Sequence, residues 1–162
     1  MRSLFVIGDS ISIQYGPYFK KMIEHRFHYD RKRGEEEALA NLDRPVGANG
    51  GDSGMVLEYL KGEQERDVRY DLLLINCGLH DVKTDPLTRK KQVPLEQYLD
   101  NLKQIVRIAK ECAQAMIWIR TTDAVENIHN HPQSTFLRFH EDVAAYNAAA
   151  DAIMNAQLHG GG

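Results

Sequence analysis

Apolar residues along this chain follow two alternating patterns: short uninterrupted runs and longer stretches with helical spacing. The runs are LFVI at 4–7, YDLLLINC at 70–77 and AMIWI at 115–119. The first two are typical of strands that are buried in a sheet, the first of them on both faces, and the third indicates another apolar strand. A shorter apolar segment at 38–42 indicates a further strand between the first two runs.

Four other segments place apolar side chains on one face of a helix. The first follows Ser12 and tolerates Pro17 in its first turn. The second begins at Met55 with Ser53 as its cap, the third begins after Pro94, and the fourth covers 139–153. The inner face of the first helix is expected to carry Tyr15, Tyr18, Phe19, Met22, Ile23 and Phe27.

Because strands and helices alternate along the chain, right-handed crossovers would produce a three-layer α/β sandwich with a parallel sheet. The sequence predicts one domain over 1–157. The last residues, 158–162, have the sequence LHGGG and are expected to form a flexible tail.

Glycine and polar residues follow two of the predicted strands. Gly8, Asp9 and Ser10 come after the first run, and GLHD at 78–81 comes after the run at 70–77. The carboxyl edge of a parallel sheet is where ligands and catalytic groups gather. Ser10 is therefore a candidate nucleophile, although Gly-Asp-Ser is equally common as a plain turn and helix cap. His80 could be catalytic or could form only structural hydrogen bonds.

The segment 45–54 contains four glycines within eight positions, so its backbone must turn tightly or approach another group closely. Free amides at the start of the helix that follows could bind a phosphate or the oxyanion of an acyl-transfer intermediate. The spacing matches neither a Walker loop nor the dinucleotide fingerprint. A glycine-rich connection without a ligand is an equally good interpretation of this segment alone.

Charge and composition exclude several classes of protein. Charged residues make up 27% of the 162 residues and the net charge is -3, which argues against nucleic-acid binding. No apolar run approaches the length of a membrane helix and no signal segment precedes the first strand, so a cytoplasmic protein without membrane contact is expected. Cys77 and Cys112 are expected to be reduced core residues.

Two further features could carry a function, but a simpler interpretation is favoured for each. The charged block at 29–37 could be a docking patch, and a solvated helix end and loop explains it as well. His129 and His131 could bind a metal, but no further ligand is spaced to complete a site. The sequence therefore predicts neither a metal nor a cofactor.

Several segments agree with one known family when they are taken together. GDSIS after the first strand, NGGDS before the second helix and GLHD after the strand at 70–77 resemble blocks I, II and III of the SGNH or GDSL hydrolases. The resemblance continues at Thr121 and Thr122 and in DVAAYNAAA of the last helix. It implies a flavodoxin-like esterase fold in which Ser10 attacks an ester carbonyl.

The resemblance also implies the surroundings of this serine. The oxyanion would be held by the backbone amides of Ser10 and Gly51 and by a side chain from block III, with Asp9, Asn49 and Asp81 in supporting roles. Block III of the family carries Asn where this chain has His80. A neutral imidazole can still donate one N–H. The GLHD form is similar to a carbohydrate-esterase-like branch of the family.

The general base of the family, a His three residues after an Asp near the C-terminus, has no counterpart in this sequence. Three explanations are open: a C-terminal segment with the last strand and helix is missing, another histidine such as His129, His131 or His80 substitutes, or the protein is not catalytic. The Gly-Gly-Gly ending favours the first. A missing edge strand would expose apolar surface and favour a homodimer.

Two functions from different classes follow from these observations. The leading hypothesis is a serine esterase that cleaves a small ester, such as the acetyl ester of a carbohydrate, without a cofactor. The alternative is a catalytically inactive binding module for a carbohydrate or a small anion. A nucleotide-binding protein is a weaker third hypothesis, because the first loop is too short to enclose a phosphate.

Overall fold

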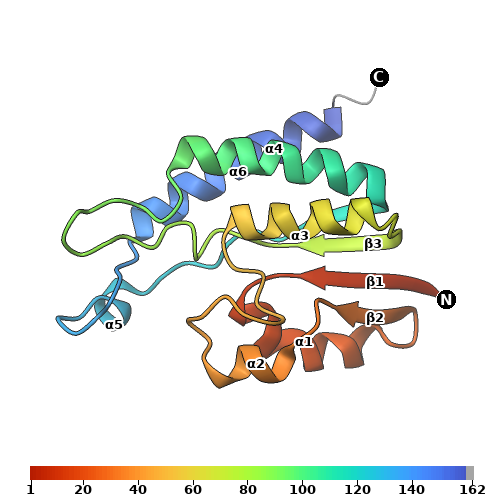
Figure 1. The fold of residues 1–162 in the computed structure, drawn as a ribbon, viewed down its shortest axis with the longest axis horizontal. Coiled ribbons are helices and arrows are strands. Elements are labelled where there is room, and N and C mark those ends of the chain that lie inside the picture. Colours follow the sequence, from red (N-terminus) through yellow and green to blue (C-terminus); the bar gives the residue numbers. More distant parts are fainter. Residues whose placement is uncertain (160–162) are drawn as a thin grey trace.

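Four parallel strands form the centre of the protein (Figure 1). The computed structural model describes residues 1–159. The strands are β1 (Arg2–Ile7), β2 (Phe27–Arg31), β3 (Tyr70–Ile75) and β4 (Ala113–Trp118), and they pair in the order β2-β1-β3-β4. All three pairings are parallel, which confirms the predicted α/β class and the parallel sheet.

Helices cover both faces of this sheet. Figure 1 shows α3, α4 and α6 together on one side and α1 and α2 on the other. This arrangement confirms the predicted three-layer sandwich. The helices are α1 (Ser10–Ile23), α2 (Glu35–Ala40), α3 (Ser53–Glu65), α4 (Leu95–Cys112), α5 (Glu126–His129) and α6 (His140–His159).

The uninterrupted apolar runs arise because neighbouring side chains of the central strands enter different cores. Leu4 and Val6 of β1 pack on the side of α1, in a cluster with Leu74. Ile7 belongs to the larger core that also contains buried residues of α3, α4 and α6. Both faces of the central strands therefore exclude water, as the sequence pattern predicts.

The second strand was predicted in the wrong segment. It lies at Phe27–Arg31, within the region that was assigned to the first helix and the charged block, and 38–42 does not form a strand. Instead Glu35–Ala40 is helix α2, which has three glutamates in its first turn. Negative side chains at the start of a helix interact favourably with its dipole, so this segment favours a helix. Strand β2 can be polar because it is an edge strand.

Three details of the predicted helices are also corrected. In α1, Tyr18 and Met22 are 73% and 71% exposed, because the helix buries a narrower face than expected. Helix α3 is capped by Asp52 rather than Ser53, since the Asp52 carboxylate accepts the amide of Met55. Helix α6 continues to His159, so the backbone of the first two residues of the expected tail is helical. The rest of that tail, 160–162, lies outside the described residues.

Strand β4 is an edge of the sheet in the described part of the chain, where it pairs only with β3. Beside it, residues of β4, α4 and α6 line a groove of about 540 Å³. The two cysteines are free and buried, as predicted. None of the described helices has both the length and the hydropathy needed to cross a membrane.

Candidate active site

Ser10 is the first residue of α1 and lies directly beyond the carboxyl end of β1. Its local geometry depends on its two preceding residues. A Cβ atom at Gly8 would come within 2.7 Å of the Ser12 Cβ, so this position has no room for a side chain. Asp9 caps α1 by accepting the amide of Ile11 at 3.0 Å. Asp9 is thus bonded to the backbone at the start of α1, and Ser10 is partly accessible.

The glycine-rich loop lies beside Ser10. The amide of Gly50 donates to the carbonyl oxygen of Gly8 at 2.8 Å, and Gly8 and Asn49 form a parallel bridge. Gly51 has φ of +71°, a backbone conformation that favours glycine. Its amide donates to the side-chain oxygen of Asn49 at 3.0 Å. The Gly51 amide was expected to be free to hold an oxyanion, but in this structure it already has an acceptor.

The amide of Ser10 is in a different position. It is one of the first amides of α1, which have no acceptor within the helix. Asp9 accepts the amides of Ile11 and Ser12, through its side chain and its carbonyl oxygen respectively. Of the amides of Ser10, Ile11 and Ser12, that of Ser10 is the one without an acceptor among the described residues.

His80 is a buried, neutral imidazole. Its side chain lies beyond β3 and is 1% exposed. Burial is the main cause that lowers the pKa of His80 to about 3, and the charges of Lys83 and Arg138 act in the same direction. Its Nδ1 atom has no hydrogen-bond partner among the described residues. A neutral imidazole carries one N–H, so His80 can act as a hydrogen-bond donor.

Asp81 connects the loop that carries His80 to the start of α3. Its carboxylate is fully buried and accepts the backbone amide and the hydroxyl of Ser53. The Ser53 hydroxyl in turn accepts the side-chain amide of Asn101 at 2.9 Å. Burial raises the pKa of Asp81 to about 7, while the hydrogen bonds from Ser53 oppose that rise. Asp81 thus ties the loop that follows β3 to the start of α3.

The two histidines that sequence reasoning offered as general bases lie elsewhere. The Nε2 atom of His129 is 2.8 Å from Nη1 of Arg138, so its lone pair is used to accept that N–H. Burial and then the charge of Arg138 lower the pKa of His129. His131 is exposed, and its backbone amide donates to Ser134 in a turn. Among the side chains of residues 1–157, no histidine forms a hydrogen bond with the Ser10 hydroxyl.

Arg138 and Lys83 are the residues of this region that sequence reasoning missed. Arg138 is 9% exposed and donates through Nε to the carbonyl oxygen of Leu79. In the sequence, the one hint that Arg138 is buried is its position between two apolar residues, Leu137 and Phe139. Lys83 follows GLHD closely, but nothing in its spacing indicated that its charge would act on His80. No cluster of three or more metal-ligating side chains occurs within the described residues.

Thr121 and Asn147, which carry the later part of the family resemblance, are brought together. The side chain of Asn147 accepts the amide of Thr121 at 2.9 Å and donates to its carbonyl oxygen at 2.8 Å. The Thr121 hydroxyl reaches the carbonyl oxygen of Cys77 at 3.3 Å. These contacts hold α6 and the end of β4 against the loop that carries His80.

Neither a protein-family model nor a curated protein matches this sequence. The fold, however, is similar to those of solved ester hydrolases. A GDSL-like lipase from Bacteroides thetaiotaomicron superposes with a TM-score of 0.63 at 15% identity, over 97% of this chain and 65% of the lipase. The acetyl xylan esterase AlAXEase has a TM-score of 0.65 at 9% identity, over 96% of this chain and 74% of that protein.

An acetylxylan esterase from Geobacillus stearothermophilus is also similar in fold. It has a TM-score of 0.62 at 18% identity, over 97% of this chain and 73% of the esterase. This chain therefore has the fold of the SGNH/GDSL-type hydrolases, as the sequence motifs indicate. It spans about 65% of the length of the GDSL-like lipase.

Proposed function

We propose that this protein is a serine ester hydrolase in which Ser10 forms the acyl-enzyme. The observation that carries the proposal is the position of Ser10 at the start of α1, beside the loop that carries the buried, unpaired imidazole of His80. The similarity of the fold to ester hydrolases supports it.

The chemistry assigns one role to each group. The Ser10 oxygen bonds to the ester carbonyl carbon, its proton passes to a base, and the carbonyl electron pair moves onto oxygen. The Ser10 amide and an N–H of neutral His80 donate to that oxyanion. Collapse of the intermediate breaks the bond to the alcohol, which leaves with a proton, and water then hydrolyses the acyl-enzyme. Gly51 contributes by shaping the neighbouring loop, because its amide is bound to Asn49.

The base is the component that the described contacts do not supply. Without a base, a serine hydroxyl is a poor nucleophile, and the remaining rate comes from the oxyanion donors and binding. A small diffusible base can replace a missing side chain. We therefore expect imidazole to accelerate the reaction of Ser10 with a fluorophosphonate, and we expect the phosphonyl group to be found on Ser10 by mass spectrometry.

The decisive experiment compares wild-type protein, Ser10→Ala and His129→Asn, with and without imidazole, using a fluorophosphonate and p-nitrophenyl acetate. His131→Asn is the matched control for His129→Asn. Ser10→Ala should remove labelling and protein-dependent hydrolysis. If His129→Asn alone removed both activities, His129 would be the base after a change of side-chain position. Labelling that is equal in wild type and Ser10→Ala would refute the assignment of the nucleophile.

One observation favours a second candidate function. Because no described histidine side chain forms a hydrogen bond with Ser10, the same edge of the sheet could serve as a binding module for a carbohydrate or a small anion. Ligand binding that is unaffected by Ser10→Ala, with no labelling or turnover even in imidazole, would support this alternative.

The finer features of the substrate and the assembly belong to the same proposal. A small ester such as an acetylated carbohydrate is the proposed substrate, and the acetyl xylan esterases of similar fold support it.

We also propose a homodimer that forms at the open edge of β4. A cytoplasmic location and the absence of nucleic-acid partners stay predictions from the sequence.

A further inference from the structure

Arg138 is a buried cation that bonds to the backbone just before His80, and the proposed reaction assigns it no role. Its Nε atom donates to the carbonyl oxygen of Leu79 at 2.7 Å, one residue before His80. A hydrogen bond from a charged donor is stronger than one between neutral groups. This contact therefore holds the backbone next to His80 firmly.

The same segment also bonds to the loop on the other side of His80. The amide of Thr84 donates to the carbonyl oxygen of Leu137 at 2.8 Å, and the amide of Leu137 donates to the carbonyl oxygen of Thr84 at 2.9 Å. Leu137 and Arg138 are neighbours in the chain, so two consecutive residues hold the loop at positions 79 and 84. His80 lies between these two points.

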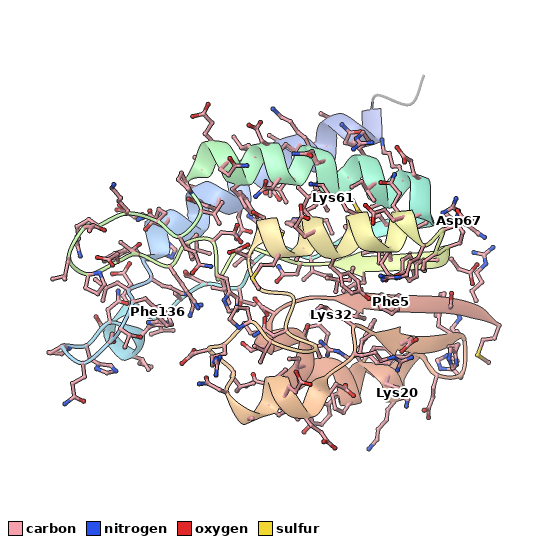
Figure 2. The ribbon with its side chains drawn as sticks, in the orientation of Figure 1. Phe5, Lys20, Lys32, Lys61, Asp67 and Phe136 are labelled. Carbon is pink, nitrogen blue, oxygen red and sulfur yellow. The ribbon has the colours of Figure 1, made fainter. Side chains whose placement is uncertain are left out.

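Arg138 is itself held in place. The side chain of Asn130 accepts the Arg138 amide at 2.9 Å and donates to the Arg138 carbonyl oxygen at 2.6 Å. The guanidinium carbon is 4.9 Å from the centre of the Phe136 ring, and Nη1 is 2.8 Å from Nε2 of His129. Figure 2 shows Phe136 beside α5, at the end of the molecule toward which the strands point. The guanidinium therefore bonds to Leu79 from a defined position.

An ion pair does not explain why this positive charge is buried. Among the side chains of residues 1–157, no carboxylate lies within 4.0 Å of the Arg138 guanidinium. Asp43 and Asp9 attract it only from longer distances. Taking a cation out of water without a close counter-ion is costly, so stability alone does not account for an arginine at this position. A role in the neighbouring site would explain why the chain tolerates this cost.

The charge of Arg138 also acts on the His80 ring. Burial is the main cause that lowers the pKa of His80, and the charges of Lys83 and Arg138 lower it further. The charge of Asp52 opposes these effects. Arg138 thus favours the neutral state that the proposed mechanism assigns to His80.

We propose that Arg138 is a positioning residue of the oxyanion site, because its bond to the Leu79 carbonyl oxygen fixes the backbone that carries the His80 ring. The ring in turn donates to the oxyanion, so Arg138 acts through His80 and does not touch the substrate. The effect of Arg138 on the reaction rate rests on the proposed function, whereas its effect on the His80 ring does not.

A double-mutant cycle tests whether Arg138 acts through His80. The measured quantity is the rate constant for labelling of Ser10 by a fluorophosphonate, with imidazole as the base. Arg138→Gln should lower this rate constant about tenfold, less than the loss expected from removing an oxyanion donor itself. In the His80→Gln background, the same substitution should change it less than about twofold. An equal loss in both backgrounds would overturn the proposal, because a general structural defect does not depend on His80.

Control variants separate this role from a loss of charge or of folding. Arg107→Gln should leave the rate constant unchanged, because Arg107 is exposed on α4 and pairs with Glu111 of the same helix. Arg138→Lys keeps the charge and one donor, so it should recover part of the rate. If circular dichroism shows that Arg138→Gln does not fold, the cycle is measured with Arg138→Lys, whose smaller loss should likewise disappear in the His80→Gln background.

A spectroscopic measurement distinguishes a failure of this proposal from a failure of the proposed function. The NMR resonances of the His80 ring nitrogens, assigned by their absence in His80→Gln, should shift and broaden in Arg138→Gln and match wild type in Arg107→Gln. Unchanged resonances in Arg138→Gln would overturn the proposal even if Ser10 is labelled. Perturbed resonances in a protein that never reacts at Ser10 would uphold the link between Arg138 and His80 and refute the proposed esterase.

Discussion

Asp81 and His80 are neighbours in the chain, and burial shifts the pKa of each in a direction that opposes its charged form. The pKa of Asp81 rises to about 7, so between pH 4 and 7 the folded protein binds more protons there than the unfolded chain. The pKa of His80 falls to about 3, so between pH 3 and 6.5 the unfolded chain binds more protons. Asp81 makes the free energy of unfolding fall as pH rises, and His80 makes it rise.

Single substitutions should separate these opposing effects. In Asp81→Asn, the free energy of unfolding relative to wild type should rise with pH between 4 and 6.5, by on the order of 1 kcal/mol per pH unit. In His80→Asn, the free energy of unfolding relative to wild type should fall as pH rises over the same range. Urea unfolding of the three proteins at several pH values measures both slopes. Parallel curves for all three proteins would contradict the assigned burial effects.

Gly78 allows β3 and β4 to approach each other at the site. A Cβ atom at this position would overlap the Thr121 hydroxyl, and φ of Gly78 is +157°. Gly78→Ala should therefore lower the free energy of unfolding by about 2 kcal/mol or more. Gly62→Ala is the matched control, because that glycine lies within α3 and its Cβ would meet only ordinary contacts.

Gly62→Ala should instead raise the free energy of unfolding by about 0.5–1 kcal/mol, because alanine is a better helix former. Denaturant titration of both variants measures the two effects. A loss of stability in both would point to a general intolerance of added side chains, and not to the close approach at Gly78.

A buried side chain of α6 bonds to the backbone just beyond β4. Asn147 is 7% exposed and pairs with both the amide and the carbonyl oxygen of Thr121. Asn147→Ala should lower the free energy of unfolding by about 1–3 kcal/mol, because two buried backbone groups lose their partner. Hydrogen exchange should also become faster at the Thr121 amide. Asn155→Ala, on an exposed position of the same helix, should change neither quantity.

The accuracy of the sequence predictions differs between elements for a physical reason. The runs at 4–7 and 70–77 are buried on both sides, so their composition alone indicates a central strand. Strand β2 is an edge strand with polar side chains, and its sequence FHYDR lacks that pattern. Helix α2 was missed because it is short. The apolar residues at 38–42 resemble a strand when the glutamates before them are ignored.

At the scale of the whole molecule, one edge of β4 has no neighbouring strand in the described chain. Ile117 on this strand is 41% exposed, and β4 pairs on one side only. Unpaired strand edges with apolar side chains favour association with another chain. We therefore expect a dimer whose population increases with concentration, measured by sedimentation velocity.

Ile117→Lys should shift this equilibrium to the monomer, because a charge on an edge strand opposes pairing. Ile128→Lys, on the exposed helix α5, is the control for adding one charge and should leave the dimer intact. A wild-type protein that stays monomeric at about 200 µM would contradict the prediction, since specific dimers are usually formed well below that concentration.

The sequence by itself determined the class of fold and the position of Ser10. Buried strands, glycine turns and helical spacing are local patterns, so they can be read without the fold, and the ordered motifs GDSIS, NGGDS and GLHD indicated which strand ends meet. The tertiary structure decided how those groups are bonded. It assigned the Gly51 amide to Asn49 and lowered the pKa of His80 by burial.

It also placed Arg138 beside Leu79, although 59 residues separate them in the chain. Hydrogen-bond partners, burial and the approach of distant charges depend on which segments pack together, and no local pattern of residue types contains that information. The candidate nucleophile was therefore predictable, whereas the hydrogen bonds and charges that surround it were not.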